Sequence, residues 1–185
     1  VEGWVGGEVQ RAVGPDDGQE DVLYFEIFRN QDGIARFYVD AFARPHKQGG
    51  AGMNDCRVRR ESGNFLQLPA AFLTCNFTPP VGDVPALLTH SEVVTLFHEF
   101  GHGLHHILTR QTCAALPAIN GVPIVAVEFP SQFMENWCCQ AEPLGPISGH
   151  WQTGWPLPVP LPTRLPAART CRSVFALVRH LELRL

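Results

Sequence analysis

Apolar residues along this chain first form short runs rich in aromatic and β-branched side chains, and from residue 91 onward they recur at helical spacing. Two of the short runs, Val22 to Phe28 and Ile34 to Phe42, flank the polar segment Asn30-Gln31-Asp32-Gly33. Runs of this kind around an Asp-Gly pair are typical of a β-hairpin with that pair in its turn. The sequence therefore predicts a hairpin over residues 22–42.

A second strand-like region covers Phe65 to Phe77, after a polar, glycine-rich connection from Arg44 to Asp55. The first 20 residues are rich in glycine and acidic side chains and show little periodicity. Together these patterns predict a small sheet within residues 21–90.

Helical spacing begins at Ser91, which can cap the free amide groups of a first turn. The pattern predicts a helix of about five turns. After the apolar run Val122 to Phe129, Pro130 is expected to start a shorter helix that continues to about Gln140. The apolar residues that define the longer helix are Val93, Val94, Phe97, Leu104 and Leu108.

Seven prolines lie between Pro143 and Pro166, and they predict a connection without regular structure. An amphipathic helix is expected over residues 167–185, because its apolar side chains share one face. The predicted fold class is α+β, mainly α with a small β-sheet. With 185 residues, the chain is long enough for one domain or for a piece of a larger one.

Composition is that of a globular protein: 45% of the residues are hydrophobic and 17% are charged. The pI is near 6.0, and no basic run is longer than Arg59-Arg60, so no nucleic-acid partner is expected. No segment approaches the roughly 18 consecutive apolar residues of a membrane span, and the first residues do not form a secretory signal. We therefore expect a cytoplasmic protein with no membrane partner. Its six cysteines lack CxxC spacing and are expected to be reduced thiols.

The segment His98-Glu99-Phe100-Gly101-His102 is an HExxH motif in the middle of the predicted long helix. Residues four apart lie about 40° apart around a helix and about 6 Å apart along it, so both imidazoles can reach one metal ion. Glu99 projects about 100° round from His98, beside the metal. Its carboxylate can take a proton from a water molecule whose pKa zinc has lowered toward 7.

Two histidines at this spacing can also be an ordinary helical pair, and His102 with His106 repeats the spacing without a following acid. The neighbouring glycines favour the functional interpretation. Gly101 and Gly103 each cost about 1 kcal/mol relative to alanine in a helix interior. Two such costs in one turn indicate that something approaches this part of the helix backbone closely.

A catalytic zinc ion has three protein ligands and one open position, so a third ligand is required. Glu128 is the outstanding candidate, because it lies in an otherwise apolar run where an unpaired carboxylate would be costly to bury. A metal ion would remove that cost. The alternative is a glutamate favoured there only by the dipole of the following helix.

These motifs resemble a known family. The strings HEFGHGLHH and VEFPSQFMENW closely resemble the thimet oligopeptidase and oligopeptidase A family of zinc metallopeptidases, above all its bacterial oligopeptidase A branch. The strings ARPHKQGG and CNFTPPVGDVPALLTHSEVVTLF are similar to the same branch. The resemblance runs from about Asp21 to Gly154 and continues more weakly toward Leu185.

The resemblance implies that His98, His102 and Glu128 bind one zinc ion and that Glu99 is the general base. The family hydrolyses internal bonds of short peptides, so short peptides are the implied substrates. It is largely helical, with its site at the bottom of a deep channel. This chain would then be a fragment of that larger fold, carrying its zincin-like HExxH helix. His105 also matches the family pattern, HEFGHxxH, and would shape the site without binding the metal.

Two departures from the family pattern affect the expected site. Members usually carry an acidic residue three positions before the metal glutamate, where this chain has Val125. If that acid orients a zinc-binding histidine, its loss weakens metal affinity 10- to 100-fold. The family also has a C-terminal substrate loop with an oxyanion-stabilising tyrosine, whereas Tyr24 and Tyr38 both lie in the predicted hairpin.

The expected organisation is a single partial catalytic domain over residues 1–185. Its expected parts are a β-rich part (21–90), zinc-site helices (91–140), a proline-rich connection (141–166) and a C-terminal helix (167–185). The favoured function is a zinc-dependent metalloendopeptidase. The alternatives are a catalytically incompetent zinc- or peptide-binding fragment without the substrate loop, and a disulfide-bonded secreted interaction domain.

Overall fold

The computed structural model describes residues 8–12, 21–111, 119, 121–156 and 158. The chain forms two compact units, Val1–Met134 and Glu135–Leu185. The helix expected at residues 167–185 lies outside the described residues, as do Cys113 and Cys171. The four described cysteines, Cys56, Cys75, Cys138 and Cys139, are free thiols.

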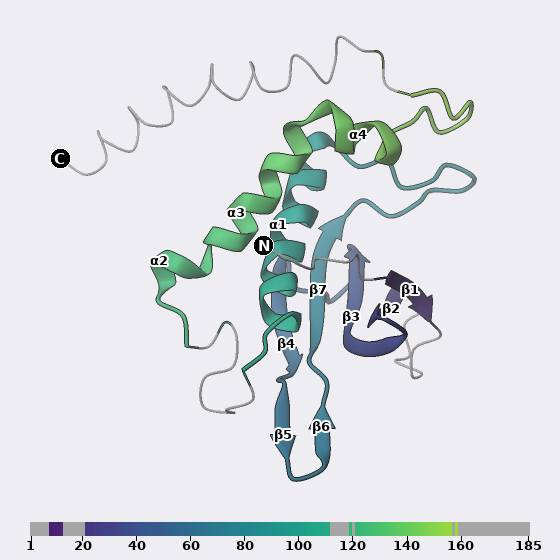
Figure 1. The fold of residues 1–185 in the computed structure, drawn as a ribbon. Helices are drawn as coiled ribbons and strands as arrows, with labels where there is room; N and C mark the ends of the chain where they lie inside the picture. The colour runs from purple at the N-terminus through teal and green to yellow at the C-terminus, as the bar shows by residue number, and fades with distance from the viewer. Residues whose placement is uncertain (1–7, 13–20, 112–118, 120, 157, 159–185) are drawn as a thin grey trace, which may run out of the picture. The chain divides into compact units, whose positions relative to one another are not determined.

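A mixed five-stranded sheet is the centre of the first unit, with the strand order β1-β2-β3-β7-β4 (Figure 1). β3 and β7 pair in parallel, and the other neighbours are antiparallel. β5 and β6 form a separate two-stranded sheet. The strands are β1 (Glu8–Ala12), β2 (Val22–Arg29), β3 (Asp32–Phe42), β4 (Gly52–Arg57), β5 (Arg60–Ser62), β6 (Phe65–Gln67) and β7 (Ala70–Phe77).

The hairpin expected over residues 22–42 is confirmed as β2 and β3, but its turn does not use the Asp-Gly pair. Left-handed backbone angles occur instead at Asn30 (φ 50°) and Gln31 (φ 72°), the two residues between the strands. Asp32 already pairs with Arg29, so the Asp-Gly pair belongs to β3. A two-residue loop with left-handed backbone angles matches the twist of the two strands. This match offsets the free-energy cost of a left-handed conformation at Gln31.

The sheet is larger than expected, because β1 and β4 give no signal in the sequence. β4 lies in the segment predicted as a connection, and β1 lies among the residues without periodicity. Both are edge strands with mostly exposed side chains, so neither carries an alternating apolar pattern. The α+β class is confirmed, but the expectation of a mainly α chain is wrong for the described residues, because strands cover 44 of them and helices 40.

α1 (His90–Ile107) packs against β3, β4 and β7. The ring of Phe100 lies 5.6 Å from that of Phe37 on β3, measured between centroids. Burying an aromatic or aliphatic side chain of this size contributes about 1.5–3 kcal/mol. The hydrophobic cluster beneath the helix contains the buried residues Ile27, Ala35, Phe37, Ala71, Leu73 and Ile107.

The expected long helix is confirmed, but its cap is Thr89 and not Ser91. The Thr89 side chain accepts a hydrogen bond from the amide of Glu92, and the Glu92 carboxylate accepts one from the amide of Thr89. This reciprocal capping box satisfies two amide groups that the helix leaves free. No described helix is both long enough and apolar enough to cross a membrane.

In the described part of the chain, the remaining helices follow Gly121: α2 (Ile124–Val127), α3 (Phe129–Glu135), the 3-10 helix η1 (Asn136–Cys139) and α4 (Ala141–Ile147). The helix expected at 130–140 therefore begins one residue earlier and tightens in its second half. α4 contradicts the expectation that the proline-rich segment has no regular structure. Pro143 lies in its first turn, where the amide has no helical partner, and Pro146 lies in its last turn.

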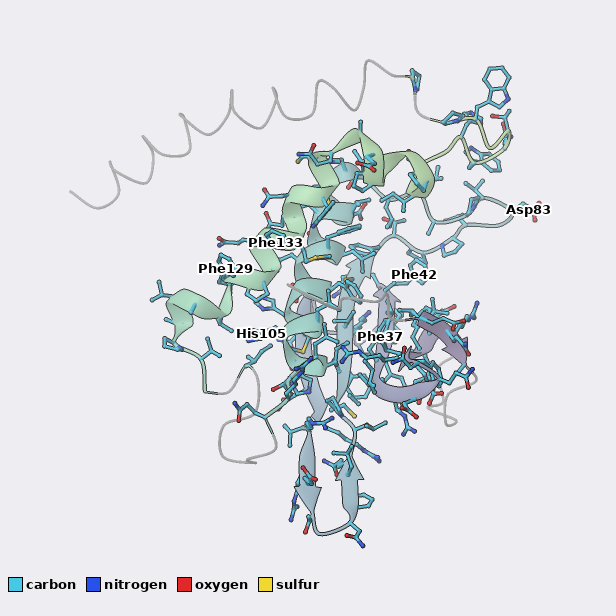
Figure 2. The ribbon with its side chains drawn as sticks, in the orientation of Figure 1. Phe37, Phe42, Asp83, His105, Phe129 and Phe133 are labelled. Carbon is cyan, nitrogen blue, oxygen red and sulfur yellow. The ribbon has the colours of Figure 1, made fainter. Side chains whose placement is uncertain are left out.

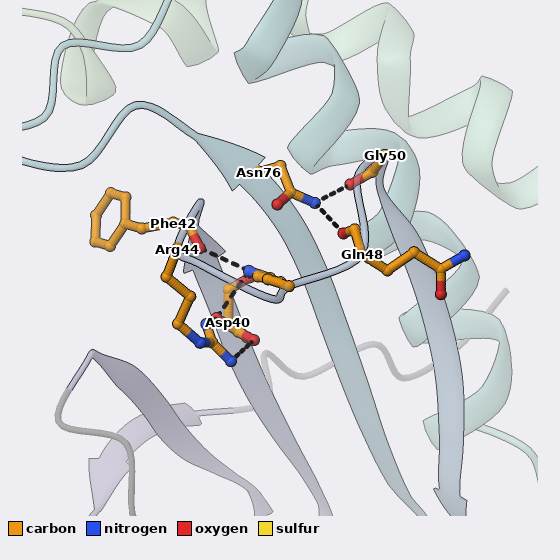
Figure 3. Close-up of polar contacts among 7 residues, drawn as sticks. Asp40, Phe42, Arg44, Gln48, Gly50 and Asn76 are labelled. Carbon is orange, nitrogen blue, oxygen red and sulfur yellow. Dashed lines mark hydrogen bonds and ion pairs between the residues drawn. The ribbon is translucent and has the colours of Figure 1, made fainter.

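An ion-pair network fixes the connection between β3 and β4 (Figure 3). Asp40 accepts two hydrogen bonds from Arg44, of 2.6 and 2.8 Å, and one of 2.9 Å from Lys47. Lys47, only 6% exposed, also donates to two backbone carbonyls of β3. Asn76 of β7 donates to two backbone carbonyls of the connection. The connection is thereby attached to both strands, which places the start of β4.

The Asp40 network is expected to lose its stabilising effect in acid. Burial acts to raise the pKa of Asp40, but hydrogen bonds from Arg44 and Lys47 outweigh it and lower the pKa. Such a group stabilises the fold fully above its unfolded-state pKa of about 3.9, and this contribution is lost as pH falls through the folded-state pKa. Urea unfolding should show the stability difference between wild type and Asp40→Asn shrinking below about pH 4. A difference that stays constant into strong acid would contradict this assignment.

Candidate metal centre

The residues of the HExxH motif lie in the middle of α1. Phe100 packs on the sheet, and a Cβ atom at Gly103 would meet Leu73 of β7 at 3.1 Å. On a helix, this orientation turns His98 and His102 away from the sheet. Their side chains are 27% and 13% exposed.

Glu128 lies between α2 and α3 and brings its carboxylate to the two histidines. The Nε2 atoms of His98 and His102 are 3.2 Å apart, and each lies 3.3 Å from Oε2 of Glu128. Ligand atoms about 2.0–2.1 Å from a tetrahedral zinc ion are about 3.3–3.4 Å apart. The three donor atoms therefore have the chemistry and the spacing that a zinc ion requires.

A backbone contact between α1 and α3 brings these residues together. A Cβ atom at Gly101 would lie 2.5 Å from Cα of Ser131 and 2.7 Å from the carbonyl oxygen of Pro130. Real Cβ atoms do not approach backbone so closely, so only glycine fits at position 101. The close approach that the sequence indicates at this turn is confirmed.

Glu99 is buried beside the histidines, with 8% of its surface exposed. Burial raises the pKa of its carboxyl group; His98 and a hydrogen bond from the Met53 backbone oppose the shift, and Glu128 adds to it. Met53 belongs to β4, so this edge strand orients the carboxylate. This contact could not be predicted from the sequence, because a backbone amide on a strand without an apolar pattern leaves no mark in the residue types.

Burial lowers the pKa of His102, which favours the neutral imidazole that a metal ligand needs. Its Nδ1 atom is buried and has no hydrogen-bond partner among the described residues. The side chain of Val125, at the position that is usually acidic in the family, is 89% exposed. The expectation that Val125 weakens metal affinity stays a prediction.

His105, labelled in Figure 2, belongs to α1 and follows His102 by three residues, about one turn. It lines an open hollow of about 570 Å³ together with Leu104, Leu108 and the segment Gly121-Val122. Burial lowers the pKa of its imidazole, and His106 adds to the shift. His105 is not among the residues whose donor atoms converge, as expected from the sequence.

Two histidines one helical turn apart, a carboxylate from the turn between α2 and α3 and a buried glutamate beside them form a site of the kind used by metal-dependent hydrolases. The protein family is shown by a comparison that covers nearly the whole chain. The chain belongs to peptidase family M3, whose family model matches residues 11–184.

Relatives in several organisms agree with this assignment. The chain is 52% identical over 165 residues to "Oligopeptidase A" of Salmonella typhimurium and equally so to that of Escherichia coli strain K12. It is 42% identical over 182 residues to "Organellar oligopeptidase A, chloroplastic/mitochondrial" of Arabidopsis thaliana. These matches cover 88%, 88% and 92% of this chain and 24%, 24% and 23% of the relatives. The resemblance to the oligopeptidase A branch is confirmed, and the chain spans about a quarter of the length of these relatives.

Proposed function

We propose that this chain carries the zinc centre of a metalloendopeptidase that hydrolyses internal bonds of short peptides. His98, His102 and Glu128 would bind one Zn²⁺, and Glu99 would act as general base. The convergence of three donor atoms at 3.2–3.3 Å carries the proposal. Membership of a peptidase family supports it.

When bound, zinc would polarise the scissile carbonyl and lower the pKa of the attacking water. Glu99 would take the proton from that water and deliver it to the leaving amine. The Met53 backbone holds the Glu99 carboxylate in place, and the burial of Glu99 keeps bulk water from competing for the proton. His98 and His102 would use their Nε2 atoms as ligands, which leaves each Nδ1 to carry the ring proton.

Metal analysis of the purified chain is the direct test. We expect about one zinc ion per chain, and saturation at 100 times the dissociation constant should add about 2.7 kcal/mol of stability. Glu128→Ala should lose the zinc and the added stability, because two histidines leave the ligand set incomplete. Mass spectrometry and thermal unfolding with and without a chelator measure both effects.

Glu142→Ala is the matched control, since Glu142 is an exposed glutamate of α4. It should bind zinc as the wild type does. A folded wild-type chain without zinc would overturn the proposed centre. Zinc retained by Glu128→Ala would remove Glu128 from the ligand set. Zinc binding without chelator-sensitive cleavage of short peptides would leave a binding fragment in place of an enzyme.

A further inference from the structure

The hydroxyl group of Ser131 lies at the point where α3 touches α1, and the mechanism above does not use it. The residue is completely buried. Its Oγ atom is 3.0 Å from Oε2 of Glu128 and 2.9 Å from the backbone oxygen of the same residue. A hydroxyl has one proton to donate, and a charged carboxylate is the stronger of these two acceptors.

The oxygen atom that Ser131 contacts is also the one that lies 3.3 Å from the Nε2 atoms of His98 and His102. The Glu128 side chain is 43% exposed, and a glutamate in such a setting can adopt many rotamers. A hydrogen bond to Oε2 restricts that freedom. It also leaves a lone pair of the oxygen available for a metal ion.

The position of the hydroxyl depends on the contact between the two helices. Because Gly101 has no side chain, the backbone at Ser131 can touch α1. The contact fixes the separation of the helices, and the hydroxyl then fixes the carboxylate relative to the imidazoles. A hydrogen bond from an outer residue to a metal ligand commonly accounts for 10- to 100-fold in metal affinity.

We propose that Ser131 is a positioning residue that sets the metal affinity of this centre by holding Oε2 of Glu128 toward His98 and His102. The inference rests on the proposed zinc site. It assigns Ser131 no contact with the substrate. Its effect therefore appears in metal binding, independently of any turnover.

The experiment compares the zinc affinity of the 185-residue chain with that of Ser131→Ala, by competition with a chromophoric chelator. Ser131→Ala should bind zinc 10- to 100-fold more weakly. The visible spectrum of the cobalt-substituted protein should also change, because the ligand oxygen is less fixed. Ser148→Ala is the control, because it removes a serine hydroxyl that likewise bonds to a helix carbonyl, and it should keep wild-type affinity.

Ser131→Thr retains the hydroxyl and adds a methyl group, so it should bind zinc more tightly than Ser131→Ala. Circular dichroism of the zinc-free proteins shows whether each variant is folded. If Ser131→Ala is unfolded, the test rests on Ser131→Thr: zinc affinity equal to that of the wild type supports the proposal, and loss of that affinity overturns it. Equal affinity of wild type and a folded Ser131→Ala would overturn the positioning role while leaving the zinc centre intact. A folded wild type that binds no zinc would overturn both.

Discussion

Replacing Glu99 with glutamine is expected to reduce cleavage of short peptides by about 10²- to 10⁴-fold, the usual contribution of a general base, while zinc content stays unchanged. Glutamine has nearly the same shape but cannot take a proton from water. Glu99 lies beside the converging donor atoms without belonging to them, so the metal ligands remain in place. Initial rates on an internally quenched peptide and metal analysis of the same samples measure the two effects.

Glu92→Gln is a matched control for this substitution, because it makes the same chemical change in the same helix. Glutamine still closes the capping box at Thr89, so the start of α1 should be unaffected. This variant should cleave peptides at the wild-type rate. Turnover that persists in Glu99→Gln would show that another group accepts the proton.

Replacing Gly101 with alanine is expected to destabilise the fold by about 1–3 kcal/mol and to weaken zinc binding. Its Cβ atom would lie 2.5 Å from backbone at Ser131, so α3 must move away from α1. The better helix propensity of alanine returns only about 1 kcal/mol. Moving α3 also moves Glu128, which widens the spacing of the three donor atoms. Urea unfolding and chelator competition measure the two losses.

Gly103→Ala provides the comparison within the same helical turn. Its Cβ atom would meet the end of the flexible Leu73 side chain at 3.1 Å, with no backbone in the way. The gain in helix propensity and the cost of moving that side chain should nearly cancel. Equal destabilisation by the two substitutions would mean that the contact at Gly101 is not specific.

The sequence predicts those parts of the fold whose side chains carry a strong local pattern. The hairpin of β2 and β3 and the long helix α1 bury one face each, so their apolar spacing identifies them. β1 and β4 are held by backbone pairing with β2 and β7, and their mostly exposed side chains show no alternation of apolar and polar residues. The turn at Asn30-Gln31 was missed because an Asp-Gly pair is the commoner signal for such a loop.

The residues of the candidate site also fall into those that the sequence predicts and those that only the structure shows. His98, Glu99 and His102 are fixed by helical spacing, and the carboxylate of Glu128 stands out in an apolar run, so residue chemistry alone identifies them as candidates. Ser131 and the Met53 backbone act through contacts that exist only once distant segments have packed. The glycine at position 101 is an intermediate case: its helix cost indicates a contact, but the contacting residue is visible only in the structure.

The position of β7 between β3 and β4 affects how the chain can assemble during synthesis. β7 pairs with β3 and β4 although it follows both in the sequence. On a ribosome that adds about 5–20 residues per second, β3 and β4 emerge with exposed edges that a chaperone or another nascent chain can bind until β7 follows. Glu128 leaves the exit tunnel later still. If zinc binds as proposed, its uptake requires both α1 and the turn that carries Glu128, so metal uptake would time the step at which these two segments pack together.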